Sequence, residues 1–124
     1  MGLPNIFVYT HDSVALGEDG PTHQPIEHLV TLRSTPNLNN WRPADPVETA
    51  IAWKDAVSSK DSPTCIIFSR QNTSPITRNN VQIEAIKNGG YLLQENADAH
   101  ITLIASGSEL QMMLDASNVL KESG

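Results

Sequence analysis

Short apolar runs alternate with amphipathic stretches over roughly the first half of the chain. Residues 6–9 and residues 65–68 form unbroken apolar runs, which are typical of buried strands in a parallel sheet; the second strand is expected over residues 64–69. A shorter strand is expected near Asn40. Apolar residues at helical spacing lie between these segments, first at Ile26, Leu29 and Val30 and then at Val47, Ala50, Ile51, Ala52 and Val57. The order strand, helix, strand, helix, strand predicts an α/β fold, in which helices flank a parallel sheet.

Proline and capping residues mark two of the expected helix boundaries. Asp45 is expected as an N-cap, because Pro46 follows it at the first helical position and Glu48 stands three residues after it. The earlier helix is expected to end near Ser34, because Pro36 disfavours helical backbone in the residue before it.

The chain after the third expected strand is organised differently. Residues 71–88 are polar and turn-rich, with room for one short helical turn. Strands are expected over residues 91–93 and 101–105, and a helix over residues 109–121. That helix would begin with a capping box of Ser106 and Glu109 and carry an apolar stripe of Leu110, Met113, Leu114 and Leu120.

We therefore expect three parts: the C-terminal part of an α/β domain over residues 1–72, a linker over residues 73–90, and the start of a second α/β domain over residues 91–124. The first part would be an incomplete three-layer domain with open sheet edges. The second would be cut short, because one strand–helix unit cannot close its own sheet.

Composition and charge narrow the function classes. The chain has 39% hydrophobic and 18% charged residues, which argues against disorder, and a net charge of −6, which argues against nucleic-acid binding. No apolar run approaches the roughly 20 residues of a membrane span, and no targeting pattern is found, so a cytoplasmic location is expected. The single cysteine, Cys65, is expected to be a buried small hydrophobe.

The loop over residues 10–25 carries the candidate chemistry. It contains two histidines, three acidic residues, two glycines and two prolines at the carboxyl end of a strand, where open α/β sheets bind ligands. Arg70 follows the third strand at the same edge of the sheet, so we expect it near His11, Asp19 and His23. The alternative is a well-capped surface loop, with His11 bonded to a backbone carbonyl, Asp19 in a turn, His23 exposed and Arg70 in a surface salt bridge.

This loop resembles a signature of the pyrimidine-binding domain of transketolases, carried here by Thr10-His11-Asp12-Ser13 and Gly17-Glu18-Asp19-Gly20-Pro21-Thr22-His23-Gln24-Pro25. Further segments resemble the family in order and spacing: residues 32–37, 41–45, 68–72, 89–93 and 105–109. Ser69-Arg70-Gln71 favours transketolase or its near relative dihydroxyacetone synthase. One departure is Val14-Ala15, where the family usually has Ile-Gly; Ala15 would distort the loop if the backbone there needs a positive φ.

The resemblance implies a role for each candidate residue. His11 and Arg70 would hold the terminal phosphate of a sugar phosphate, and Asp19 would accept a hydrogen bond from a sugar hydroxyl. His23 would lie beside the aminopyrimidine of thiamine diphosphate and assist proton transfer as the catalytic residue. The family moves a two-carbon ketol unit from a ketose phosphate to an aldose phosphate in the pentose phosphate pathway.

The resemblance also implies a cofactor, thiamine diphosphate with Mg²⁺ or Ca²⁺, for which the chain lacks the main motifs. A Gly-Asp-Gly segment with a downstream Asn is not found, and the family's activating glutamate lies before the first strand of this chain. Family active sites form in homodimers. We therefore expect the chain alone to be inactive and to need the rest of a transketolase chain. The alternatives are a non-catalytic α/β module, a split-chain partner of a thiamine-diphosphate enzyme, or a dihydroxyacetone synthase-like transferase.

Overall fold

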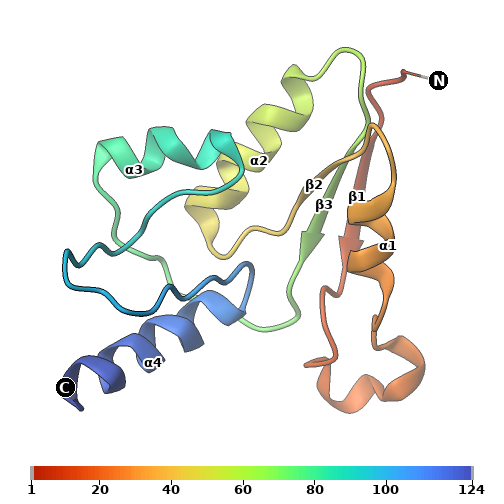
Figure 1. The fold of residues 1–124 in the computed structure, drawn as a ribbon. Helices are drawn as coiled ribbons and strands as arrows, with labels where there is room; N and C mark the ends of the chain where they lie inside the picture. The colour runs from red at the N-terminus through yellow and green to blue at the C-terminus, as the bar shows by residue number, and fades with distance from the viewer. Residues whose placement is uncertain (1, 124) are drawn as a thin grey trace.

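A three-stranded parallel sheet forms the centre of the first part of the molecule (Figure 1). The computed structural model describes residues 2–123. Strand β3 (Thr64–Phe68) lies between β1 (Ile6–Thr10) and β2 (Asn39–Trp41), and both neighbours run parallel to it. The three strands expected over the first part of the chain, and their parallel direction, are confirmed.

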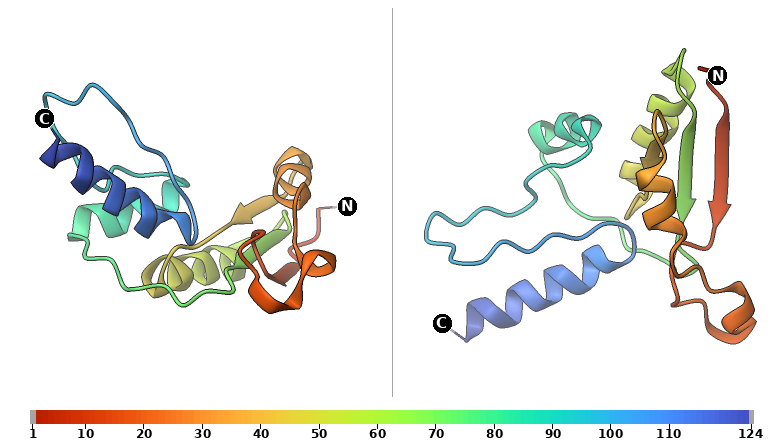
Figure 2. Two further views of the ribbon diagram at one scale, coloured as in Figure 1. Left: turned by 90° about the horizontal axis from the view of Figure 1, so that it is seen from below. Right: turned by 45° about the vertical axis from the view of Figure 1, so that its right-hand side comes forward.

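Two helices cover this sheet from opposite sides. Helix α1 (His28–Ser34) connects β1 to β2, and helix α2 (Pro46–Ser58) connects β2 back to β3. The connection from β1 to β2 crosses from one edge of the sheet to the other, and the connection from β2 to β3 returns to the centre. Two right-handed crossovers in opposite directions place their helices on opposite faces, and the views in Figures 1 and 2 show this arrangement. The expected α/β fold, with helices flanking a parallel sheet, is confirmed.

The core lies between α2 and β3. Ala52, Ala56 and Ile66 are buried there, and Ile6, Trp41 and Phe68 pack against them. Two alanines on one helix face let α2 approach the sheet closely, because they carry no bulk beyond Cβ. The indole N–H of Trp41 donates to the Asp55 carboxylate of α2 at 2.8 Å, which fixes the helix against β2.

The expected start of α2 is also confirmed. The Asp45 side chain accepts a hydrogen bond from the Glu48 backbone N–H at 3.0 Å, and Pro46 occupies the first turn. The Glu48 carboxylate accepts from the backbone N–H of Ala44 at 2.8 Å, one residue before the cap. These bonds satisfy backbone donors that have no partner within the helix.

Burial differs between the two apolar strands. Cys65, Ile66 and Ile67 of β3 are buried, as expected for the central strand and for the lone cysteine. The expected burial of β1 is wrong: Phe7, Val8 and Tyr9 are 40%, 48% and 45% exposed. Strand β1 lies at the edge of the sheet, with a strand neighbour on one side alone among the described residues. Apolar composition predicts that a segment forms a strand, but not whether that strand lies at the centre or at the edge of the sheet.

The chain after β3 contains helices and extended segments. Helix α3 (Asn80–Ala85) continues into the 3₁₀ helix η3 (Ile86–Asn88), and α4 (Glu109–Glu122) closes the described chain. The expected short helical turn and the expected C-terminal helix are confirmed. Asn79 and Gln82 form a capping box at α3, with side-chain to backbone bonds of 2.9 and 3.0 Å.

Three expectations for this region are wrong. Residues 91–93 and 101–105 form no strand, because no strand pairs with them within the described chain; the carbonyls of Leu92 and Leu93 accept from the Gln82 side chain instead. The capping box of Ser106 and Glu109 is absent: the N-cap of α4 is Ser108, and it makes no side-chain cap bond. Both Ser106 and Glu109 contact Arg42 instead.

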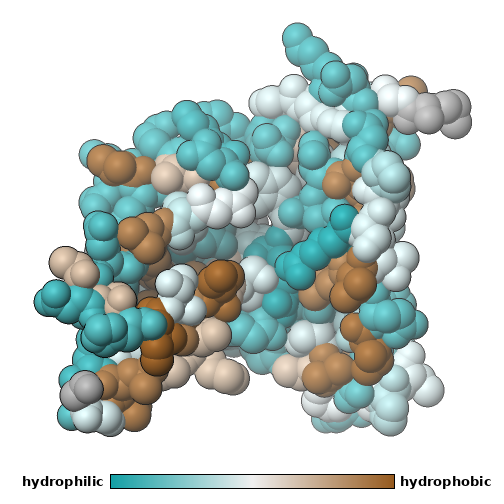
Figure 3. Space-filling view, viewed as in Figure 1, coloured by the Kyte–Doolittle hydropathy of each residue, from teal (hydrophilic) through white to brown (hydrophobic). Residues whose placement is uncertain are grey.

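The apolar stripe of α4 lines a wide groove. Leu110, Met113 and Leu114 are half-buried, whereas Leu120 is 48% exposed. The rest of this groove is lined by most of residues 89–106, by one side of α1, and by residues of β2, α2, β3 and η3. Figure 3 shows apolar surface gathered over α4 and the neighbouring extended chain. No helix within residues 2–123 is both long enough and apolar enough to cross a membrane.

Candidate functional site

The candidate loop leaves β1 at the carboxyl edge of the sheet and contains two single turns of 3₁₀ helix, η1 (Gly17–Asp19) and η2 (Pro21–His23). Gly20 joins these turns with a φ of 77°, a conformation that favours glycine. Leu16 anchors the loop, since it is 2% exposed. Ala15 does not have the positive φ that would have strained the loop; Asn37 is the one described non-glycine residue that does.

The structure brings Asp19 and Arg70 together. Arg70 follows the carboxyl end of β3, and its Nε lies 3.9 Å from Oδ2 of Asp19. The two side chains are 50% and 46% exposed. An ion pair this long and this open to solvent contributes less than about 1 kcal/mol. The guanidinium of Arg70 therefore remains accessible to a stronger anionic partner.

The two histidines of the loop lie in different environments. His11 is half-buried, and its Nδ1 is buried with no hydrogen-bond partner. The alternative in which the His11 ring bonds a backbone carbonyl is not found within residues 2–123. His23 is exposed, with Nδ1 3.0 Å from the Thr22 hydroxyl. In the described chain neither ring forms a hydrogen bond or an ion pair with Asp19 or Arg70.

An ion cluster beside this loop, buried at Asp12 and Arg42, was not predicted from the sequence. Asp12 is 2% exposed, and its Oδ2 accepts from Nε of Arg42 at 2.7 Å. Nη1 of Arg42 donates to the Ser106 carbonyl at 3.0 Å and pairs with the Glu109 carboxylate. Arg42 lies in a segment that resembles the family, but no spacing rule connects it to residues so far along the chain.

The electrostatics of this cluster follow from its geometry. Burial opposes the charge on Arg42, but the hydrogen bonds and negative charges of Glu109 and Asp12 outweigh it and raise the Arg42 pKa. Burial would raise the pKa of Glu109, yet the hydrogen bond and charge of Arg42 hold it below its ordinary value. Arg42 and Glu109 are therefore both charged at neutral pH.

A second buried cluster lies at the start of α2. The side chains of Arg78 and Asp45 are 1% and 0% exposed and form an ion pair. Arg78 also donates to Glu48 at 2.9 Å and to the Tyr91 hydroxyl at 2.6 Å, while Tyr91 donates to Glu48 at 2.7 Å. This cluster joins residues 76–91 to α2. Its members face one another, so we assign it no ligand.

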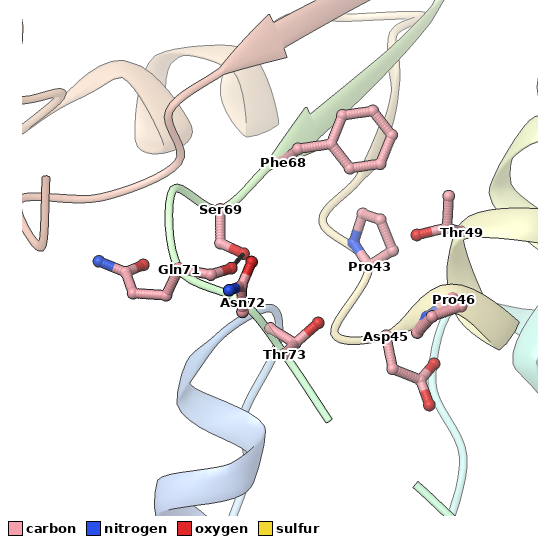
Figure 4. A pocket seen from close by; sticks show the side chains of 9 residues that line it. All are labelled: Pro43, Asp45, Pro46, Thr49, Phe68, Ser69, Gln71, Asn72 and Thr73. Carbon is pink, nitrogen blue, oxygen red and sulfur yellow. Dashed lines mark hydrogen bonds between the residues drawn. The ribbon is translucent and has the colours of Figure 1, made fainter. Parts of the chain in front are cut away.

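A pocket of about 370 Å³ lies beside this second cluster (Figure 4), lined by Pro43, Asp45, Pro46, Thr49, Phe68, Ser69, Gln71, Asn72 and Thr73. None of the four candidate residues lines it. Its one charged residue, Asp45, is already paired with Arg78 and would repel an anion. Its chemistry does not suit a phosphate, so the pocket is a poorer candidate than the edge where Asp19 and Arg70 meet.

The described residues do not fit the metal that accompanies thiamine diphosphate. Within residues 2–123 no three or more His, Cys, Asp or Glu side chains gather so that they could hold a metal ion. The family resemblance implies that the diphosphate of the cofactor is bound through that metal, so we assign no cofactor-binding step to these residues.

Comparison with known proteins identifies several relatives of the chain. Residues 1–75 match the family model described as the transketolase pyrimidine binding domain. Transketolase 2 of Vibrio parahaemolyticus is 50% identical over 125 aligned residues, which cover 100% of this chain and 19% of that protein. This chain thus spans about a fifth of the length of the curated relatives it matches.

Solved structures agree with this match. A transketolase variant from Pichia stipitis superimposes with a TM-score of 0.93 at 45% identity, covering 99% of this chain and 18% of that one. The Pichia stipitis transketolase in complex with sedoheptulose-7-phosphate superimposes with a TM-score of 0.91 at 42% identity, with the same coverage. At these identities the similarity extends to sequence as well as fold.

Proposed function

The chain belongs to the transketolase family, and we propose on that basis that it supplies part of the sugar-phosphate site of a thiamine-diphosphate-dependent transketolase. That enzyme would move a two-carbon ketol unit from a ketose phosphate to an aldose phosphate. The observation that carries the proposal is the exposed guanidinium of Arg70, which lies beside Asp19 at the carboxyl edge of the sheet. The relative crystallised with sedoheptulose-7-phosphate supports the substrate class.

We propose that Arg70 and His11 hold the terminal phosphate. A guanidinium presents a planar fork of donors that matches phosphate oxygens, and an imidazole N–H adds another donor. Hydrogen bonds to a charged group contribute about 1.5–3 kcal/mol, more than the roughly 1 kcal/mol available from an exposed ion pair. A phosphate would therefore displace Asp19 from Arg70, and the carboxylate of Asp19 would be free to accept from a sugar hydroxyl.

His23 is proposed as the catalytic residue, moving a proton at the reacting oxygen of the substrate. An imidazole ionises near neutral pH, which suits it to both accept and return a proton. The exposed ring of His23 supports this role, because it is open to a substrate. Thiamine diphosphate would supply the electron sink for the carbanion, and Mg²⁺ or Ca²⁺ its anchor, through residues outside this chain.

We further propose the division into residues 1–72, a linker over residues 73–90 and a second part over residues 91–124. The family match over residues 1–75 supports the first boundary. A homodimer, a place in the pentose phosphate pathway and a cytoplasmic location stay predictions. Sugar phosphates, the rest of a transketolase chain and a second subunit are the partners that this proposal requires.

A chimera tests the proposal. The aligned segment of Vibrio parahaemolyticus transketolase 2 is replaced by this chain, and two-carbon transfer from xylulose 5-phosphate to ribose 5-phosphate is measured in a coupled assay with thiamine diphosphate and magnesium. We expect an active chimera, and no turnover by the 124-residue chain alone. Arg70→Ala should raise the KM for xylulose 5-phosphate about 10- to 100-fold, as for a lost bond to a charged group.

Two results would contradict the proposal. A chimera that folds and binds thiamine diphosphate but transfers no ketol unit would favour a non-catalytic module. An unchanged KM for xylulose 5-phosphate in the Arg70→Ala chimera would remove Arg70 from the phosphate site. Lys54→Ala, at an exposed position on α2, is the matched control for loss of one positive charge.

A further inference from the structure

Arg42 joins three segments that are distant in the sequence. It stands directly after β2, holds Asp12 in the loop after β1, and holds Ser106 and Glu109 at the start of α4. The backbone at the start of α4 leaves room for the Arg42 side chain. A Cβ atom added to Gly107 would lie 2.7 Å from Nε of Arg42 and 2.9 Å from its Cζ. The φ of Gly107 is 62°, so glycine also suits the backbone there.

The contacts of Arg42 show that it is unsuited to bind a substrate itself. Nε and Nη1 are occupied by Asp12, Ser106 and Glu109, and its side chain is 11% exposed. Two carboxylates face one guanidinium, so the cluster carries net negative charge and would repel a phosphate. Any effect of Arg42 on a substrate must therefore act through the residues that it holds.

The residue next to this cluster is His11. Its ring makes no hydrogen bond in the described chain, so no side-chain partner sets its orientation. The backbone that carries it is fixed one residue later, where buried Asp12 binds Arg42 at 2.7 Å. This is the one ion pair in the described chain that the loop makes with a buried partner, since the Asp19–Arg70 pair is exposed.

We propose that Arg42 is a positioning residue for the sugar-phosphate site. By holding Asp12 it fixes the backbone that presents His11 to the phosphate. By holding Ser106 and Glu109 it joins the same loop to the start of α4. This inference rests on the proposed function, because it concerns the same phosphate.

Arg42→Lys in the chimera tests this role. Lysine keeps the positive charge, but a single ammonium cannot span Asp12 and Ser106 as a guanidinium does. The KM for xylulose 5-phosphate should rise about tenfold, the equivalent of one weakened bond to a charged group. The KM and kcat for xylulose, which lacks the phosphate, should not change. Arg33→Lys, at an exposed position of α1, is the matched control.

The outcomes separate this inference from the proposed function. Equal losses with xylulose and xylulose 5-phosphate would mean that Arg42 serves the fold alone, and would overturn the inference. If the KM is unchanged for Arg42→Lys but raised for Arg70→Ala, the inference about Arg42 is overturned and the proposed phosphate site still stands. A raised KM for Arg42→Lys beside an unchanged KM for Arg70→Ala would support it, with His11 holding the phosphate without Arg70.

A second measurement uses the 124-residue chain itself. Hydrogen exchange followed by mass spectrometry should show faster exchange at residues 11–13 and at residues 106–110 in both Arg42→Lys and Gly107→Ala. Exchange in β3 should not change, because its hydrogen bonds lie in the centre of the sheet. Unaltered exchange in the loop after β1 would overturn the inference whatever the kinetics of the chimera.

Discussion

Arg78 offers the sharpest test of what holds this chain together. Its side chain is 1% exposed and forms ion pairs with Asp45 and Glu48, besides bonds to the Tyr91 hydroxyl and the Ile76 carbonyl. Arg78→Met removes the positive charge and leaves the Asp45 carboxylate buried without a cation. Removing one partner of a buried ion pair lowers the free energy of unfolding by about 3–5 kcal/mol, because the remaining charge is neither solvated nor paired.

That cost is large for a chain of this size. Domains are stable by about 5–15 kcal/mol, so Arg78→Met should remove about a fifth or more of the total. With a urea m-value of about 1.5 kcal/mol/M, the unfolding midpoint should fall by about 2–3 M. Urea unfolding followed by the fluorescence of Trp41 and Trp53 measures this, since Trp41 packs against the core.

A double substitution separates the buried charge from lost packing. Asp45→Asn removes the negative charge but keeps a side-chain oxygen for the cap of α2, because asparagine is as good an N-cap as aspartate. Arg78→Met with Asp45→Asn should therefore be more stable than Arg78→Met alone. Lys87→Met is the matched control: its pair with Glu84 is 3.5 Å long and exposed. A loss for Arg78→Met no larger than for Lys87→Met would refute the reasoning.

Two further predictions concern titration and reactivity. Burial would raise the Asp45 pKa, but bonds from the Glu48 N–H and from Arg78 hold it below its ordinary 3.8, so stability should fall as pH drops below about 4. Burial and the bond to Glu48 raise the pKa of Tyr91 from 10.0 to about 12, so stability should also fall as the pH rises from about 10 to about 12. Urea unfolding midpoints measured against pH would show the loss of stability in acid and in alkali. Tyr91→Phe should make the alkaline loss smaller. Burial raises the pKa of the Cys65 thiol, so a thiol reagent should label it only as fast as the chain unfolds; labelling that does not slow when urea is removed would contradict this.

The sequence pattern predicted correctly those elements that depend on interactions between neighbouring residues. The apolar run of β3 and the Asp45-Pro46 start of α2 were both recognised from neighbouring residues, and both appear as expected. The candidate loop was also placed correctly at the carboxyl end of β1, because parallel strands bring their ends to one edge. The meeting of Asp19 and Arg70 follows from the same rule.

The failed expectations all depend on contacts at long range. Residues 91–93 and 101–105 have strand-like composition but no neighbouring strand, and β1 is exposed because it lies at an edge. Ser106 and Glu109 have the spacing of a capping box, yet the Ser106 hydroxyl and the Glu109 carboxylate both contact the charged Arg42, a stronger partner than a neutral backbone N–H.

The sequence by itself therefore determined which segments are strands and helices in the first part of the chain, and which loop carries the candidate chemistry. The tertiary structure alone decided that Asp12, Arg42 and Glu109 form one cluster and that Arg78 lies buried against Asp45. The physical reason is distance along the chain. Hydrophobic periodicity and capping act within a few residues, whereas these ion pairs join residues 30 or more positions apart.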